Sequence, residues 1–166
     1  LRRAWEIYAA FLFLLICYFI VIWGVGSRSR FLDETNTKIF FDNPGTALLH
    51  AAILQYTPVN TDILPTFVLL HLGFPIVLWL LMRSSTAALA VSFLLYLTVQ
   101  IFGWNLWKWP NGEMYFNPLA WQFLFVFGAW YAHDGALRLK TIVQSRALLA
   151  LTSLYLVISL TIALSW

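Results

Sequence analysis

The fold is decided by residues 104–130, which read WNLWKWPNGEMYFNPLAWQFLFVFGAW. This stretch combines an aromatic loop, a helix-start signal and an apolar segment that continues without a charge to Ala132. Asn117 is a candidate helix cap, and Pro118 fits the first helical position. Trp and Tyr collect where a membrane meets water, because their rings are apolar and their N–H or O–H groups need a partner. The stretch therefore predicts a membrane boundary followed by a helix that enters the bilayer.

The composition of the chain excludes a single soluble globular domain. Of its 166 residues, 61% are hydrophobic and 10% are charged, whereas soluble domains carry about 25% charged residues. The length allows about five spans of roughly 20 apolar residues each. The net charge of +3 is small, and its positive residues lie mainly at helix ends, so no nucleic-acid partner is expected. The single cysteine, Cys17, excludes an intrachain disulfide.

We therefore predict an all-α polytopic membrane bundle, with residues 1–166 as a single transmembrane domain. The expected spans are residues 4–24, 63–82, 86–102, 118–132 and 147–166. Residues 46–56 have helical spacing but are too short to span, which predicts a short interfacial helix on the periplasmic side. Asp62 is a candidate cap for the second span, and Pro75 predicts a kink within that span.

The positions of lysine and arginine predict the orientation. The larger set lies near the N-terminus and in the short connections, and the smaller set lies in the longer connections. The larger set is Arg2, Arg3, Arg83, Arg138, Lys140 and Arg146, and the smaller set is Arg28, Arg30, Lys38 and Lys108. Because positive residues concentrate on the cytoplasmic side, we expect a cytoplasmic N-terminus and an aromatic loop on the opposite side.

Two groups of residues are candidates for function. His71 is ionisable and lies near the middle of a span, where such residues often mark function, although it can equally pack beside the carbonyl that Pro75 frees. The aromatic loop carries rings that can stack on sugars and polar groups that can bind hydroxyls. The candidates for this glycan platform are Trp104, Trp107, Trp109, Glu113, Tyr115, Asn117 and Trp121. An ordinary aromatic belt is the alternative, and neither a metal nor a cofactor is expected in this chain.

Four segments resemble the OpgC family of integral-membrane acyltransferases. They are RRAWEIY at residues 2–8, TPVNTDILPTF at residues 57–67, FGWNLW at residues 102–107 and YFNPLAWQFLFVFGAW at residues 115–130. The resemblance implies a bacterial inner-membrane protein that transfers a succinyl group onto a periplasmic glucan, with succinyl-CoA as the donor. It adds Asp62 and His71 to the candidates for the acceptor side and assigns no catalytic residue.

The same resemblance leaves the catalytic role open. Members of the family are longer, so the chain is expected to correspond to their C-terminal half, with the Asp-His motif of catalysis in the preceding spans. Phe11 stands where the first motif leads us to expect a histidine, and a phenylalanine cannot transfer a proton. The alternative is therefore a non-catalytic transmembrane subunit of a larger membrane complex, derived from an OpgC-like ancestor, which packs against lipids and other subunits.

Overall fold

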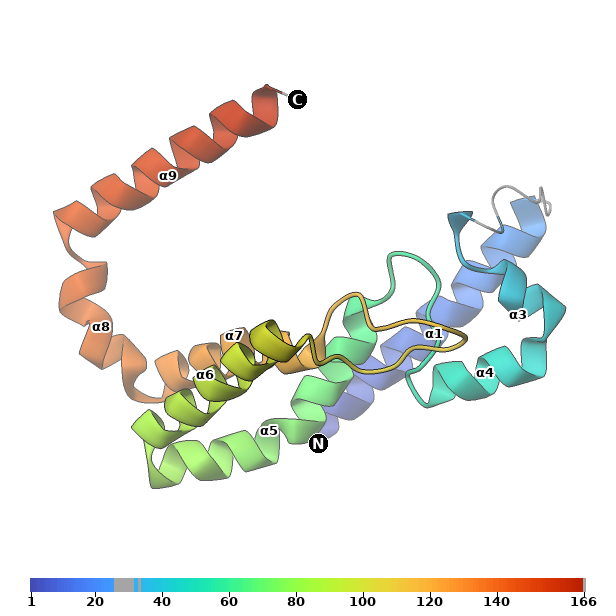
Figure 1. Ribbon diagram of the computed structural model, residues 1–166, viewed down its shortest axis with the longest axis horizontal. Helices are drawn as coiled ribbons and strands as arrows, with labels where there is room; N and C mark the ends of the chain where they lie inside the picture. The colour runs from blue at the N-terminus through green and yellow to red at the C-terminus, as the bar shows by residue number, and fades with distance from the viewer. Residues whose placement is uncertain (26–31, 33, 166) are drawn as a thin grey trace. The chain divides into compact units, whose positions relative to one another are not determined.

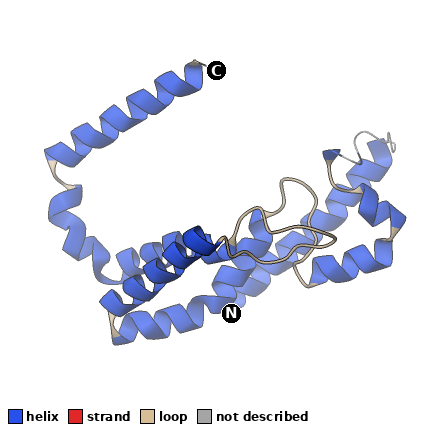
Figure 2. Ribbon diagram, in the orientation of Figure 1, coloured by secondary structure: helices blue, strands red, loops and turns tan. Residues whose placement is uncertain are grey.

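The described residues form an all-helical membrane protein, as predicted (Figure 1 and Figure 2). The computed structural model describes residues 1–25, 32 and 34–165, so Arg28 and Arg30 lie outside the described residues. Within this part, four helices are long and apolar enough to cross a bilayer, namely α1, α5, α6 and α9. The elements are α1 (Arg2–Val25), α3 (Lys38–Asp42), α4 (Pro44–Ala52), α5 (Ile63–Arg83), α6 (Ser85–Phe102), α7 (Pro118–Trp130), the π-helical η1 (Tyr131–Gly135), α8 (Ala136–Val143) and α9 (Arg146–Leu164).

The helix predicted at residues 118–132 begins as expected and has a shorter α-helical part. Asn117 caps α7, because its Oδ1 accepts a hydrogen bond from the N–H of Leu119 at 3.0 Å. The 13 residues of α7 extend about 20 Å at ~1.5 Å per residue, which is less than the ~30 Å hydrocarbon core. The helical path continues directly through η1 and α8. A span at this point therefore needs residues beyond α7.

The chain divides into two compact units, residues 1–126 and residues 127–166. In the second unit, Asp134 of η1 forms an ion pair with Arg138 of α8 at 2.7 Å. Ser145 caps α9 by accepting a hydrogen bond from the N–H of Leu148 at 3.2 Å. The described residues of α9 include none that is buried within the chain, so this helix presents apolar side chains all round, as expected of a helix in lipid.

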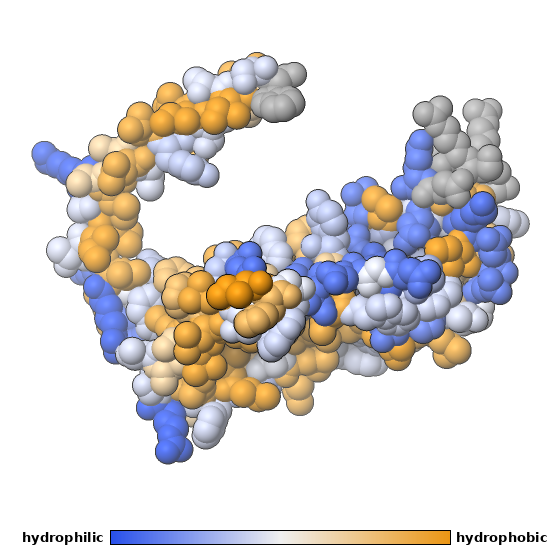
Figure 3. All heavy atoms as spheres, viewed as in Figure 1, coloured by the Kyte–Doolittle hydropathy of each residue, from blue (hydrophilic) through white to orange (hydrophobic). Residues whose placement is uncertain are grey.

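The core of the first unit follows α1. Phe11, in the first half of α1, is fully buried against Val68 of α5. Phe19, in the second half, packs with Ala47 of α4 and stacks on Phe40 of α3, and Figure 1 shows α3 and α4 running beside this part of α1. In the view of Figure 3, hydrophilic residues gather over the end of the unit that holds α3 and α4, and hydrophobic residues cover α5 to α7. Helices α3 and α4 are thus packed against the second half of α1.

The short predicted helix differs from α4 in its boundaries, since α4 starts before residues 46–56 and ends within them. It ends there because Leu54 adopts a left-handed backbone conformation, with φ of 64°. The N–H of Gln55 binds the carbonyl of His50 at 2.7 Å, and the N–H of Leu54 binds the carbonyl of Ala51 at 2.9 Å. This is a Schellman motif, which usually has glycine at the left-handed position. Burial of the Leu54 side chain offsets the backbone strain here.

Helices α5 and α6 are separated by a single residue, and α6 is joined to α7 by side-chain hydrogen bonds. Pro75 lies inside α5, and the ribbon of this helix bends along its length in Figure 1, as a proline within a helix predicts. Ser84 alone separates α5 from α6 and caps α6 through the N–H of Ala87 at 3.2 Å. Ser92 of α6 donates to the side-chain oxygen of Gln122 at 2.6 Å, and the Gln122 amide donates back to the Ser92 carbonyl at 2.8 Å. This pair joins α6 to α7 by hydrogen bonds that a bilayer would not otherwise supply.

Gly103 ends α6 with φ of 66°, and no heavy atom lies within 4 Å of the position that a Cβ would occupy. We expect Gly103→Ala to lower the free energy of unfolding by about 1 kcal/mol, because the only cost is the left-handed backbone. Gly73→Ala is the matched control, since Gly73 has the same open space and lies inside α5. Thermal unfolding in detergent measures both variants, and equal stability of the two would contradict this account of the α6 terminus.

Candidate functional site

The loop between α6 and α7 is a hairpin, called here the aromatic hairpin (residues 103–117). The N–H of Lys108 binds the carbonyl of Gly112 at 2.9 Å, and the N–H of Met114 binds the carbonyl of Leu106 at 2.9 Å. Trp107 and Glu113 pair across the hairpin as an isolated antiparallel bridge. These bonds give the loop a defined shape and hold its two arms together.

A partly buried ion pair ties the aromatic hairpin to the start of α5. The Lys108 ammonium pairs with Oδ1 of Asp62, and the Thr57 hydroxyl donates to the same oxygen. The Lys108 and Asp62 side chains are only 18% and 16% exposed, so water screens their attraction weakly. Asp62 was predicted to cap α5, which is wrong, because its backbone is helical and its carboxylate makes no capping hydrogen bond. The carboxylate is held by Thr57 and Lys108 instead.

A second anchor of the hairpin is Trp109. Its backbone N–H donates to the carbonyl of Gln55 at 2.9 Å, and its ring stacks on the His50 ring with centroids 4.8 Å apart. Its ring also meets Tyr56 edge-on at 5.7 Å. Burial raises the pKa of Tyr56, and the nearby Tyr18 phenol adds to the effect, so the Tyr56 hydroxyl keeps its proton and donates to a backbone carbonyl at 2.6 Å. Trp109 is therefore an internal anchor of the loop.

A cavity of about 620 Å³ lies between the aromatic hairpin and the residues that lead into α5. It is called here the polar cavity, because charged and hydrogen-bonding side chains form part of its lining. It brings together three of the predicted candidates, Asp62, Glu113 and Tyr115. The ion pair of Asp62 with Lys108 is neutral as a whole, so the exposed Glu113 carboxylate gives the cavity a net negative character. The complete lining is Val59, Asn60, Asp62, Ile63, Lys108, Glu113, Tyr115 and Phe116. Hydrogen-bonding groups and aromatic rings thus converge on one space.

The other loop candidates lie outside the lining of this polar cavity. Trp104 and Asn117 are joined to each other, because the Asn117 amide donates to the Trp104 carbonyl at 2.6 Å. Trp107 is half exposed and has its ring 6.2 Å from that of His50. Trp121 borders two smaller apolar cavities on α7. The predicted platform is therefore divided among several environments.

His71 is occupied by contacts within the first unit. Its Nδ1 donates to the carbonyl of Phe67, one turn earlier on α5, at 2.8 Å. Its ring lies 5.2 Å from that of Phe125 of α7, in an edge-to-face arrangement. It does not line the polar cavity. The carbonyl that the ring binds is that of Phe67, and not the His71 carbonyl that Pro75 leaves without its helical donor.

Sequence reasoning did not single out several residues of the polar cavity and its frame. Lys108 entered only the count of positive charges, and Thr57 and Phe116 were not considered as site residues. The usable signal was a lone cation within an aromatic loop, which needs a carboxylate partner when it is taken out of water. Its partner lies 46 residues earlier in the chain, so no local spacing could identify it.

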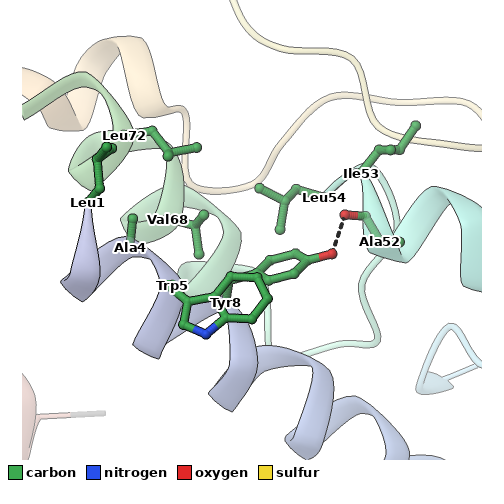
Figure 4. Close-up of a pocket in the computed structure, with 9 residues that line it drawn as sticks. All are labelled: Leu1, Ala4, Trp5, Tyr8, Ala52, Ile53, Leu54, Val68 and Leu72. Carbon is green, nitrogen blue, oxygen red and sulfur yellow. Dashed lines mark hydrogen bonds between the residues drawn. The ribbon is translucent and has the colours of Figure 1, made fainter.

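A second cavity, of about 430 Å³, lies between α1, the end of α4 and α5 (Figure 4). Figure 4 shows Tyr8 at its edge, with the hydroxyl donating to the carbonyl of Ala52 at 2.8 Å. Its lining is almost entirely apolar and includes Trp5, Leu54 and Val68. It contains none of the predicted site residues. The described residues include no group of three or more His, Cys, Asp or Glu side chains arranged for a metal.

The partly buried ion pair of Asp62 and Lys108 can be tested by a double-mutant cycle on Asp62→Asn and Lys108→Met. Each single change leaves a polar group without its partner, so we expect the two sites to be coupled by about 1–3 kcal/mol in the free energy of unfolding. Arg2→Met with Glu6→Gln is the matched control, because Arg2 in that pair is 92% exposed. Its coupling should be about 0–0.5 kcal/mol, and equal coupling in both cycles would contradict a special role for Lys108.

Six of the eight residues that line the polar cavity fall within the segments that resemble one family, and Lys108 and Glu113 lie between two of those segments. No curated protein and no solved structure matches the chain. The family model described as OpgC protein matches residues 1–166, which is the whole chain. The chain therefore belongs to the OpgC protein family.

Proposed function

We propose that this chain takes part in acyl transfer onto glucans and that its polar cavity receives the glucan acceptor. The observation that carries the proposal is the meeting of Asp62, Glu113 and Tyr115 around one cavity of about 620 Å³. Carboxylates accept hydrogen bonds from sugar hydroxyls, and the Tyr115 ring, which is 82% exposed, offers a flat apolar face to the sugar ring. A cavity with a few convergent polar groups is also the usual form of a small-molecule site.

The reaction in this proposal is the transfer of a succinyl group from succinyl-CoA to a glucan hydroxyl. The hydroxyl oxygen attacks the thioester carbonyl carbon, the carbon–sulfur bond breaks and an ester bond forms. The hydroxyl proton leaves with the thiol of CoA, so atoms and charges balance. The residues of this chain bind and orient the acceptor, and we assign none of them to the movement of the proton.

The proposal includes a location. The chain resides in the bacterial inner membrane with its N-terminus in the cytoplasm, and the polar cavity opens to the periplasm, where the glucan is found. Support comes from the excess of Lys and Arg in the short connections. The polar cavity lies where α5 begins and the aromatic hairpin ends, which is the side that this orientation assigns to the periplasm.

An alternative function is that of a non-catalytic subunit, and one observation favours it. Phe11, which stands where a histidine was expected, is fully buried and packs with Leu54 and Val68. This position contributes an apolar side chain to the core and carries no group that can transfer a proton. In the subunit hypothesis, the chain presents a glucan to a catalytic partner within the membrane.

Replacement of Tyr115 tests the acceptor site. We expect Tyr115→Ala to weaken the binding of a linear glucan oligosaccharide about tenfold, because loss of one stacking ring costs about 1–1.5 kcal/mol. Tyr155→Ala is the matched control, since Tyr155 is 70% exposed on α9 and lies in the other unit. Isothermal titration in nanodiscs measures both variants, and unchanged affinity of Tyr115→Ala would remove the polar cavity as the acceptor site.

Phe11→His separates the two functional hypotheses. A histidine in this dry position should lower the free energy of unfolding by about 2–4 kcal/mol, because it loses apolar packing and buries an unpaired nitrogen. Phe11→Leu is the control and should cost less. The measurement is thermal unfolding combined with succinyl transfer to glucan in membranes. A stable Phe11→His protein with increased transfer would contradict a purely structural role for this position.

A further inference from the structure

The polar cavity has an apolar neighbour. An apolar cavity of about 120 Å³ lies between α5 and α7, and it shares Ile63 and Phe116 with the polar cavity as common walls. The backbone carbonyl of Phe116 is fixed by the Thr66 hydroxyl at 2.7 Å, so this shared wall is held in place by a buried residue of α5. A polar space and an apolar space therefore adjoin at the point where α5 leaves the polar end of the bundle.

The apolar side extends further along α7. Another cavity, of about 290 Å³, lies against α6 and α7 and shares Trp121 and Leu124 with the apolar cavity between α5 and α7. Trp121 is 42% exposed and Leu124 is 61% exposed, so this path is open to the surrounding lipid. An apolar cavity of about 150 Å³ can hold a benzene ring. The cavity between α5 and α7 is slightly smaller and has room for the first few methylene groups of a hydrocarbon chain, which would continue past Trp121 into the bilayer.

The charged side chains of the polar cavity favour an uncharged head group on such a ligand over an anionic one. Asp62 and Lys108 neutralise each other, and Glu113 leaves the polar cavity with a net negative character. A phosphate would be repelled there, whereas uncharged hydroxyls can donate to the carboxylates. Among the described residues, both hydrogen bonds to the Asp62 carboxylate go to Oδ1, so Oδ2 can accept from a hydroxyl of the ligand.

We propose that the acceptor at this site is a membrane-anchored glycolipid, with an uncharged sugar in the polar cavity and its hydrocarbon chain in the apolar path over Phe116 and Trp121. This inference rests on the proposed function, because it names the class of acceptor for the same cavity. A lipid anchor adds apolar burial to the binding of a sugar that water would otherwise hold strongly. It also restricts the sugar to the membrane surface, where the polar cavity opens.

The test uses the full protein in phosphatidylcholine nanodiscs that contain monoglucosyl diacylglycerol and phosphatidylglycerol with the same acyl chains. Native mass spectrometry counts the lipids that remain bound after extraction. We expect glucolipid to be retained in preference to either phospholipid. Trp121→Ala should reduce that retention about tenfold. Trp79→Ala should not, because Trp79, which is 57% exposed, lies on α5 outside the polar cavity and the two apolar cavities beside it.

The head-group side has its own variant. Glu113→Gln removes the net charge of the polar cavity, so retention of phosphatidylglycerol relative to glucolipid should rise. An unchanged ratio would contradict the argument from charge. Equal retention of glucolipid and phospholipid by the wild-type protein would overturn the inference and indicate ordinary surrounding lipid only.

A water-soluble glucan oligosaccharide separates this inference from the function on which it rests. If the oligosaccharide binds with the same affinity to the wild type and to Trp121→Ala while glucolipid is not retained, the polar cavity is a glucan site without a lipid anchor and only the inference fails. If neither the oligosaccharide nor the glucolipid binds, the proposed acceptor site fails as well. Retention of glucolipid that depends on both Trp121 and Glu113 supports the inference.

Discussion

The contact between Lys108, Asp62 and Thr57 is the interaction on which the polar end of the first unit depends. It joins a loop between α6 and α7 to the residue that precedes α5, across 46 positions of sequence. Because both charges are largely withdrawn from water, each stabilises the other and neither is easily replaced. The pair holds the aromatic hairpin over the start of α5, so Glu113 and Tyr115 face the same space as Asp62. The polar cavity exists because this contact is made.

Most of the helical fold could be predicted from composition and from local start and stop signals. The Asn117-Pro118 start, the single-residue turn at Ser84 and the apolar runs of α1, α5, α6 and α9 are all local features. The end of α4 could not be predicted, because a leucine occupies the left-handed position where the pattern favours glycine. The π-helical turn that ends α7 is likewise set by packing, since the Trp130 ring fills the space beside Gly135.

The sequence indicated which types of residue the candidate site contains, but it did not indicate which of them face the same space. Aromatic and acidic residues were recognised in the loop, but a hairpin sends neighbouring side chains to opposite faces. Trp109 therefore turns inward onto His50 and Tyr56, while Glu113 and Tyr115 reach the polar cavity. Asp62 was recognised for the wrong role, because a capping motif is local and its actual partner is distant. Residues such as Asp62 and Lys108, which are distant in sequence and meet only in the folded chain, produce no local spacing pattern that would identify them as partners.

The reciprocal hydrogen bonds between Ser92 and Gln122 have a consequence for how the helices can slide. A shift of α7 along α6 by one turn, about 5.4 Å, would separate both pairs of groups in a medium without water to replace them. These two hydrogen bonds therefore fix the register of α6 against α7 within the bilayer. Because α6 and α7 carry the two ends of the aromatic hairpin, the same bonds fix the relative height at which those ends leave the membrane. The level at which the arms of the hairpin present Glu113 and Tyr115 is thus set from inside the bilayer, by residues that do not line the polar cavity.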